Sequence, residues 1–116
     1  MARASTTADV FNAIAEPQRR RILNLLVKGE RPVAQIVTKL KLTQPQVSKH
    51  LRVLRAVDLV RVRGDGQQRL YSLKAKSLKP IHDWVIGFEQ FWNESFDRLE
   101  NYLHTLSQKE NGDDKK

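Results

Sequence analysis

The sequence contains no cysteine, which excludes disulfide bonds, thiolate metal sites and cysteine nucleophiles. It has no apolar run near the roughly 18 residues that cross a membrane, and residues 1–7 lack the apolar core of a signal peptide. The three histidines are scattered, and the turn at residues 64–66 lacks the strand-to-helix setting of a phosphate loop. No catalytic constellation can be assembled from these residues. We therefore expect a small cytoplasmic protein that is not an enzyme and carries no cofactor.

Positive charge is concentrated in the earlier part of the chain. The 116 residues are enough for one domain, and 21 Lys and Arg against 13 Asp and Glu give a net charge of +8. Residues 1–76 hold 16 of these cations against five acids, a balance of +11, whereas residues 77–116 hold five against eight, a balance of −3. A solvated surface of mixed charge is the ordinary explanation of charged runs. A split of this size instead favours a polyanionic partner, and nucleic acid is the usual one.

Helical periodicity in the first half of the chain predicts a helix-turn-helix. Thr7 can cap a first helix, and Pro17 can begin a second. Apolar residues then recur at helical spacing over residues 33–40 and again over residues 47–54, with Thr43 as the N-cap of the later helix. Two short amphipathic helices joined by a short turn are typical of a helix-turn-helix.

After this motif the spacing of the apolar residues changes to that of a strand, and further along the chain it becomes helical again. Residues 59–63 alternate apolar and basic side chains as a half-buried strand does, Gly64–Gly66 is a turn signal, and residues 68–73 are typical of a returning strand. We expect a mainly α fold with a small β-hairpin, namely a winged helix-turn-helix with a long C-terminal dimerisation helix. The expected boundaries are a disordered N-terminus at 1–6, the domain at 7–107 with its C-terminal helix at 78–107, and a polar tail at 108–116.

Three stretches of the sequence carry a family resemblance. They are Ile14–Leu23 (IAEPQRRRIL), Leu42–Leu54 (LTQPQVSKHLRVL), and Leu59–Val60 with the glycine-rich turn that follows. Together they resemble the ArsR family of bacterial repressors over more than half of the chain, and the second stretch is the most discriminating. The resemblance implies a dimeric transcriptional repressor whose recognition helix begins near Thr43. A two-fold dimer would place two recognition helices about 34 Å apart, one turn of DNA, and would bind an inverted-repeat operator.

The polar residues of the predicted recognition helix face away from its apolar stripe. Glutamine amides can pair with adenine edges, serine can donate to bases or phosphate, and cations suit phosphates or guanine. His50 lies beside the apolar stripe, so it is either a DNA contact or a histidine held by packing and a hydrogen bond. We expect base contacts from Gln44, Gln46 and Ser48, and backbone contacts mainly from Thr43, Lys49 and Arg52.

The predicted hairpin carries arginines at its outward positions. In a DNA-binding wing, Arg61, Arg63 and Arg69 would lie near phosphates or the minor groove. Charged side chains also protect the edge strand of a sheet from pairing with other chains, which is the alternative explanation. We favour the wing.

The C-terminal helix carries a broad aromatic stripe. Such a stripe more often belongs to a hydrophobic core. Here the apolar residues that the core leaves uncovered would form an exposed patch, which usually marks an interface. A second copy of the chain is the simplest partner. Gly87 would permit the close approach of a neighbouring helix, and an apolar ligand pocket near Trp84 and Trp92 is an alternative to plain packing. The predicted dimer interface comprises Ile81, Trp84, Val85, Phe88, Trp92, Phe96, Leu99 and Leu103.

Many ArsR-like repressors release DNA on binding a metal, so we looked for side chains in this sequence that could bind a metal ion. The candidates here are His82, Asp83, Glu89 and His104. His82 and His104 are 22 residues apart, about 33 Å on a straight helix, and His82 and Glu89 are about 10 Å apart, too far for one ion. We therefore predict no metal site.

Two alternative functions remain open. One is a metal-responsive repressor with a His/carboxylate site across the dimer. The other is a protein-interaction module that uses the aromatic C-terminal helix and does not bind DNA. The acidic polar face of that helix argues against an anionic membrane as its partner. No inducer is indicated by the sequence.

Overall fold

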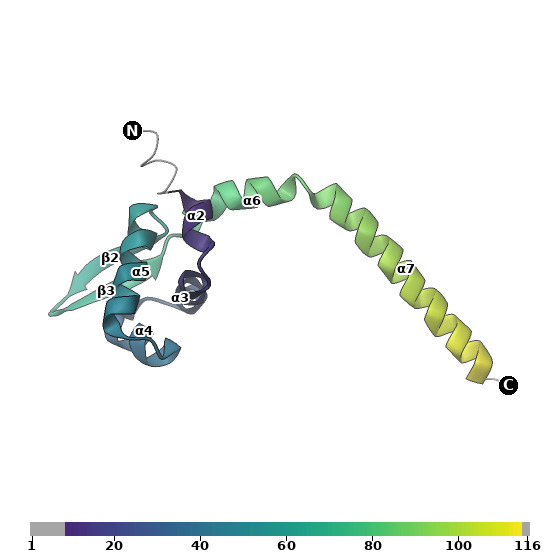
Figure 1. The fold of residues 1–116 in the computed structure, drawn as a ribbon, viewed down its shortest axis with the longest axis horizontal. Coiled ribbons are helices and arrows are strands. Elements are labelled where there is room, and N and C mark those ends of the chain that lie inside the picture. Colours follow the sequence, from purple (N-terminus) through teal and green to yellow (C-terminus); the bar gives the residue numbers. More distant parts are fainter. Residues whose placement is uncertain (1–8, 115–116) are drawn as a thin grey trace. The chain divides into compact units, whose positions relative to one another are not determined.

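A computed structural model describes residues 9–114 of the chain, with side chains described as far as residue 109. The chain divides into two compact units, Met1–Ile81 and His82–Lys116 (Figure 1). The predicted disordered segment at 1–6 and the predicted cap Thr7 lie outside the described residues.

Short helices with clear sequence signals precede the hairpin in the first unit. Asp9, and not the predicted Thr7, caps the first of them by accepting a hydrogen bond from the Asn12 backbone N–H at 2.7 Å. Pro17 begins the second helix, as predicted, because its missing N–H would have no helical partner at that position. Lys41 ends the third helix in the left-handed conformation, with φ of 57°, and so makes the tight turn of the helix-turn-helix. These helices are α2 (Val10–Ile14), α3 (Pro17–Val27), α4 (Val33–Leu40) and α5 (Gln44–Ala56).

The wing is part of a three-stranded antiparallel sheet with the order β1-β3-β2. Its strands are β1 (Arg31–Pro32), β2 (Val60–Asp65) and β3 (Gln68–Leu73). The hairpin was predicted, but the pairing of the extended link at Arg31–Pro32 with β3 was not. The turn is also shifted, because Gly64 and Asp65 lie in β2 and the two loop residues are Gly66 and Gln67. Positive φ at Gly66 alone is the pattern of a II′ hairpin turn.

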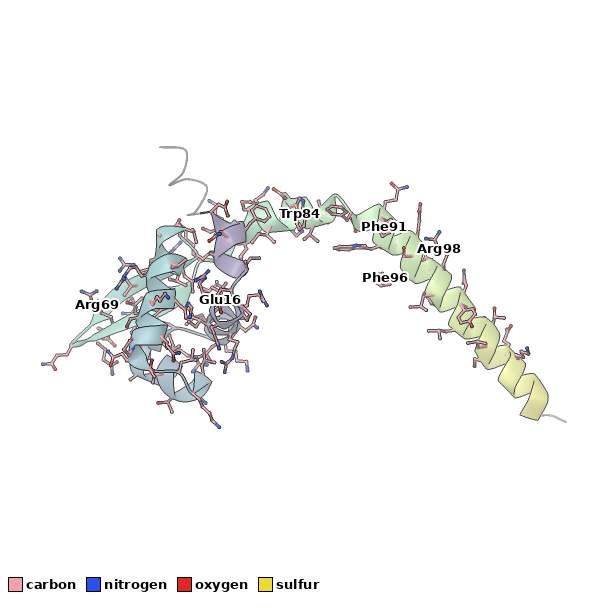
Figure 2. The ribbon with its side chains drawn as sticks, in the orientation of Figure 1. Glu16, Arg69, Trp84, Phe91, Phe96 and Arg98 are labelled. Atoms are coloured by element: carbon pink, nitrogen blue, oxygen red, sulfur yellow. The ribbon has the colours of Figure 1, made fainter. Side chains whose placement is uncertain are left out.

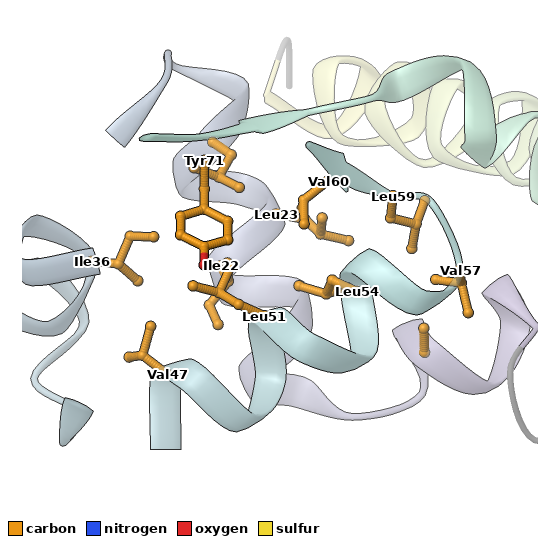
Figure 3. Close-up of a cluster of buried hydrophobic side chains, with 12 residues drawn as sticks. Ile22, Leu23, Ile36, Val47, Leu51, Leu54, Val57, Leu59, Val60 and Tyr71 are labelled. Carbon is orange, nitrogen blue, oxygen red and sulfur yellow. The ribbon is translucent and has the colours of Figure 1, made fainter. Parts of the chain in front are cut away.

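One hydrophobic core joins the helices of the first unit to the sheet (Figure 3). The apolar stripe of α5 is buried as the helical spacing predicts, with Val47 and Leu54 fully inaccessible to solvent. Ile36 of α4 is equally buried, and Tyr71 of β3 closes the core from the side of the sheet. Because one face of α5 is fixed in this core, its opposite face is presented to solvent on a rigid support.

The C-terminal region forms two helices, whereas the sequence predicted a continuous helix over residues 78–107. A 3-10 turn at Ala75–Leu78 leads into α6 (Lys79–Ile86), and α7 (Glu89–Asp114) follows. The break lies at Gly87 and Phe88, whose backbone N–H groups donate to the carbonyls three residues earlier. Glycine has low helix propensity, which explains the position of the break. Helix α7 continues to Asp114, into the residues predicted as a polar tail.

None of the helices described over residues 9–114 is both long and apolar enough to cross a membrane.

Candidate nucleic-acid interface

Helix α5 begins with a capping box. The Gln46 backbone N–H donates to Thr43 Oγ1 at 3.3 Å, and the Thr43 backbone N–H donates to Gln46 Oε1 at 2.9 Å. The Thr43 hydroxyl donates to the same Gln46 oxygen at 3.1 Å. These bonds satisfy backbone groups that the first helical turn leaves unpaired. The start of α5 is therefore fixed, and the amide oxygen of Gln46 is occupied in the cap.

The polar face of α5 is exposed. Gln44, Lys49 and Arg52 are exposed, while Ser48 and His50 are half-buried. Over the described part of the chain, the side chains of Gln44, Lys49 and Arg52 have no hydrogen bond or ion pair with the protein. These three side chains are consequently free to meet a ligand, and each has the chemistry for a base edge or a phosphate.

His50 contacts an arginine of the neighbouring helix. Its Nδ1 lies 3.5 Å from a terminal guanidinium nitrogen of Arg19 on α3. Burial lowers the pKa of His50 below its usual 6.5, and the charges of Arg19 and Lys49 lower it further against the opposing effect of Glu16. A neutral imidazole can accept at Nδ1 from Arg19, which leaves Nε2 as the remaining donor.

Two arginines of α3 bond the end of α2. Arg19 Nε donates to the Ala13 carbonyl at 2.6 Å, and Arg20 donates to the Ile14 and Ala15 carbonyls at 2.7 and 3.1 Å. A helix end leaves its last carbonyls without helical partners, so these arginines cap α2. The sequence showed these residues only as a basic run. The caps depend on how α2 and α3 meet, which no local pattern encodes.

The wing arginines differ in their surroundings. Arg63 forms a two-pronged ion pair with Glu30, with both nitrogen–oxygen distances at 2.8 Å. That hydrogen bond and the charge of Glu30 raise the pKa of Arg63. Arg61 and Arg69 are exposed and have no such partner among the described residues. Figure 2 shows Arg69 on the hairpin.

A cleft of about 470 Å³ lies between α5 and β3. Ser48, Arg52 and Arg55 line its helical side, and Arg69 and Tyr71 line its strand side. Arg55 is absent from the residues predicted to bind DNA, although it lies seven residues after Ser48 and so falls on the same helical face. The helical spacing could have indicated it, but its proximity to the wing depends on the tertiary fold.

The apolar residues predicted for the dimer interface are mostly solvent-exposed. Trp84 and Phe96 are 59% and 63% exposed, and both are shown in Figure 2. The rings of Trp84 and Phe88 meet edge to face at 5.4 Å between centroids, and Phe88 stacks on Trp92 at 6.5 Å. Ile81 and Val85 are half-buried, and the exposed members are Trp84, Phe88, Trp92, Phe96, Leu99 and Leu103.

Possible metal ligands do not gather within the described residues. No group of three or more His, Cys, Asp or Glu there could hold a metal ion. His82 Nδ1 lies 3.5 Å from Asp83 Oδ1, and both side chains are exposed. Glu89 and His104 are exposed on α7. The His/carboxylate alternative therefore finds no support within a single described chain.

Comparisons with known proteins identify the family and the fold of the chain. The family model described as "Bacterial regulatory protein, arsR family" matches residues 16–62. The transcriptional repressor SdpR of Bacillus subtilis is 32% identical over 80 residues, which cover 69% of this chain and 89% of SdpR. A probable mercury resistance operon repressor of Streptomyces lividans is 40% identical over 68 residues, covering 59% of this chain and 54% of that protein. The crystal structure of NolR from Sinorhizobium fredii matches with a TM-score of 0.61 and 37% identity, over 72% of this chain and 84% of NolR.

The element order and the match to the NolR structure define a winged helix-turn-helix fold. The chain belongs to the ArsR family of DNA-binding transcription regulators. This family consists of regulators rather than enzymes, in agreement with the sequence-based expectation.

Proposed function

We propose that the chain is a homodimeric transcriptional repressor that binds an inverted-repeat operator. The observation that carries this proposal is the exposed polar face of α5, where Gln44, Lys49 and Arg52 are without partners among the described residues. The buried opposite face holds the helix still, so the backbone that carries these side chains meets DNA with little ordering cost. Repression is supported by the description of SdpR as a transcriptional repressor.

Base reading falls mainly to the first half of α5. Gln44 has a free amide, which can pair with an adenine edge. Gln46 keeps its amide nitrogen for donation, although its oxygen is held in the capping box. Ser48 can donate to a base or a phosphate, and His50 can reach DNA through Nε2, since Nδ1 faces Arg19.

Phosphate contacts come from both α5 and the wing. Lys49 and Arg52 extend from the exposed face of the helix, with Thr43 at its start. Arg61 and Arg69 are free to reach phosphates or the minor groove. Arg63 would have to exchange its ion pair with Glu30 for a phosphate, so we assign it a weaker role.

The dimer is proposed to form through α6 and α7, within a functional domain at 7–107. The six exposed members of the predicted interface are between 40% and 63% exposed. Burying so much apolar surface against a second copy is favourable, at about 25 cal/mol per Å² of apolar area removed from water. Two-fold symmetry then lets the same surface serve both copies.

A gel-shift titration tests the proposed function. We expect tight binding to an inverted repeat near the protein's own gene, weakening steeply between about 50 and 200 mM salt. Gln44→Ala should relax the sequence preference, while the control Gln90→Ala, on α7, should leave it intact. Equal affinity for random DNA of the same length would contradict a specific operator.

A further inference from the structure

The cleft between α5 and β3 is lined on both sides by cations. Ser48, Arg52 and Arg55 are spaced by four and three residues, which places them on one face of the helix. Arg69 and Tyr71 are two residues apart, which places them on one face of the strand. Two unrelated elements thus direct arginines to the same cleft, and its lining includes no carboxylate.

The arginines of this cleft are available to a ligand, whereas several others in the first unit are engaged. Arg63 is paired with Glu30, and Arg19 and Arg20 cap α2. The side chains of Arg52, Arg55 and Arg69 have no hydrogen bond or ion pair in the part of the chain that the structure describes. Three positive charges held together without a counter-charge favour an anion. A volume of about 470 Å³ leaves room for a hydrated phosphate group.

We propose that this cleft binds a phosphate group of the DNA backbone and that Arg55 is one of its ligands. The inference rests on the proposed function, since it supposes that α5 lies against DNA. Arg55 lies nine residues after Gln46, about 13 Å further along the helix, so it is remote from the base-reading turn. The guanidinium fork suits two oxygens of one phosphate, and Arg69 approaches the same group from the wing. The cleft therefore fixes how far the wing and the helix can separate on the duplex.

A salt titration of DNA affinity tests this site through Arg55→Gln. The slope of log affinity against log salt should fall by about 0.9 for each phosphate that the variant no longer neutralises, hence by about 1.8 for a dimer. Affinity should fall at least about fivefold for operator and random DNA alike, because a phosphate contact carries no sequence information. The matched control Lys28→Gln removes an exposed cation of the same unit outside the cleft and should leave the slope unchanged.

The conservative variant separates charge from geometry. Arg55→Lys should keep the wild-type salt slope but bind more weakly than arginine, since lysine lacks the fork. A role limited to the C-terminal end of α5 would change thermal stability without changing the slope. Wild-type operator binding with an unchanged slope in Arg55→Gln would overturn the inference and leave the proposed function intact. Failure of the wild type to bind any DNA would overturn both.

A titration with inorganic phosphate identifies the source of the anion. At constant ionic strength set with chloride, phosphate should shift the NMR signals of Ser48 and Arg52 in the wild type and not in Arg55→Gln. These shifts together with a reduced DNA slope support the inference. The same shifts with an unchanged slope would mean that the cleft binds a small free phosphate instead of DNA, which overturns it.

Discussion

Among single residues, the arginines of the first unit have two roles: some cap helix ends, and others are free to bind a ligand. Arg19 and Arg20 saturate carbonyls at the end of α2, and Arg21 donates to the Leu40 carbonyl at 2.9 Å. The guanidinium groups of Arg52 and Arg69 have no hydrogen bond or ion pair among the described residues. The first unit therefore offers fewer cations to DNA than its net charge suggests, because some of its arginines stabilise helix ends instead.

His50 should make stability depend on pH. Its pKa in the folded protein is lowered, chiefly by burial and then by Arg19, so the folded state binds fewer protons than the unfolded state just below pH 6.5. The free energy of unfolding should therefore be highest above pH 6.5 and fall as the pH drops through the window below that value. Urea unfolding at several pH values measures this. His50→Gln should lose this part of the pH dependence, and an unchanged profile in the variant would contradict the assignment.

At the scale of elements, the start of α5 depends on a small set of hydrogen bonds. Thr43→Ala removes the side chain that accepts from Gln46 and should lower the free energy of unfolding by about 1 kcal/mol. Gln46→Glu preserves an acceptor for the Thr43 backbone and should keep stability near the wild-type value. That same variant should bind DNA poorly, because a carboxylate replaces the amide. Urea unfolding and gel shifts measure the two effects, and equal stability losses would be inconsistent with the capping box.

The wing should bind DNA more strongly when Glu30 is neutralised. Glu30→Gln releases Arg63 from its ion pair, so affinity at low salt should rise and the salt slope should steepen by about 0.9 for each wing. Asp65→Asn is the matched control, since it also removes one acid but frees no arginine from that pair. Anisotropy titrations of labelled DNA report both quantities. Equal increases in the two variants would show that total charge, and not Arg63, causes the effect.

Much of the element order could be predicted because its signals are local. The apolar spacing of α4 and α5, the cap Thr43 and the alternation in β2 all act within a few residues. The pairing of β1 could not be predicted, since Arg31–Pro32 is too short for a strand pattern and its partner Tyr71 is distant in sequence. The break at Gly87 has a local cause, because glycine has low helix propensity. Helices often tolerate a single glycine, however, and the aromatic stripe on both sides of Gly87 favoured one continuous helix.

The sequence could predict that the polar face of α5 and the wing form the candidate site, but not which of their cations are free. The buried stripe of α5 determines which of its positions are exposed, so the exposure of Gln44 and Lys49 could be predicted from the sequence. The engagement of Arg63 with Glu30 depends on the approach of two distant segments. The same is true of Arg55, whose cleft is lined by residues of both α5 and β3. Residue type and periodicity therefore indicate the surface, and tertiary contacts decide which of its cations are free.

At the scale of the whole molecule, dimerisation and operator binding should be coupled. Trp92→Ala removes a large, partly exposed ring from the proposed interface and should weaken dimerisation at least about thirtyfold, with a parallel loss of operator affinity. Asn93→Ala changes the adjacent exposed position and should affect neither. Sedimentation analysis and gel shifts measure the two properties. A Trp92→Ala protein that remains dimeric at micromolar concentration would contradict the interface.

In the proposed dimer, two copies of α5 bind the same DNA duplex. Selection of bound sequences from a random DNA library tests this most directly, because it presupposes neither the operator nor the regulated gene. The expected result is an enriched motif with two-fold symmetry, whose half-sites are centred about 10 base pairs apart, one helical turn. Enrichment of a single unsymmetrical half-site, or of no motif at all, would contradict it.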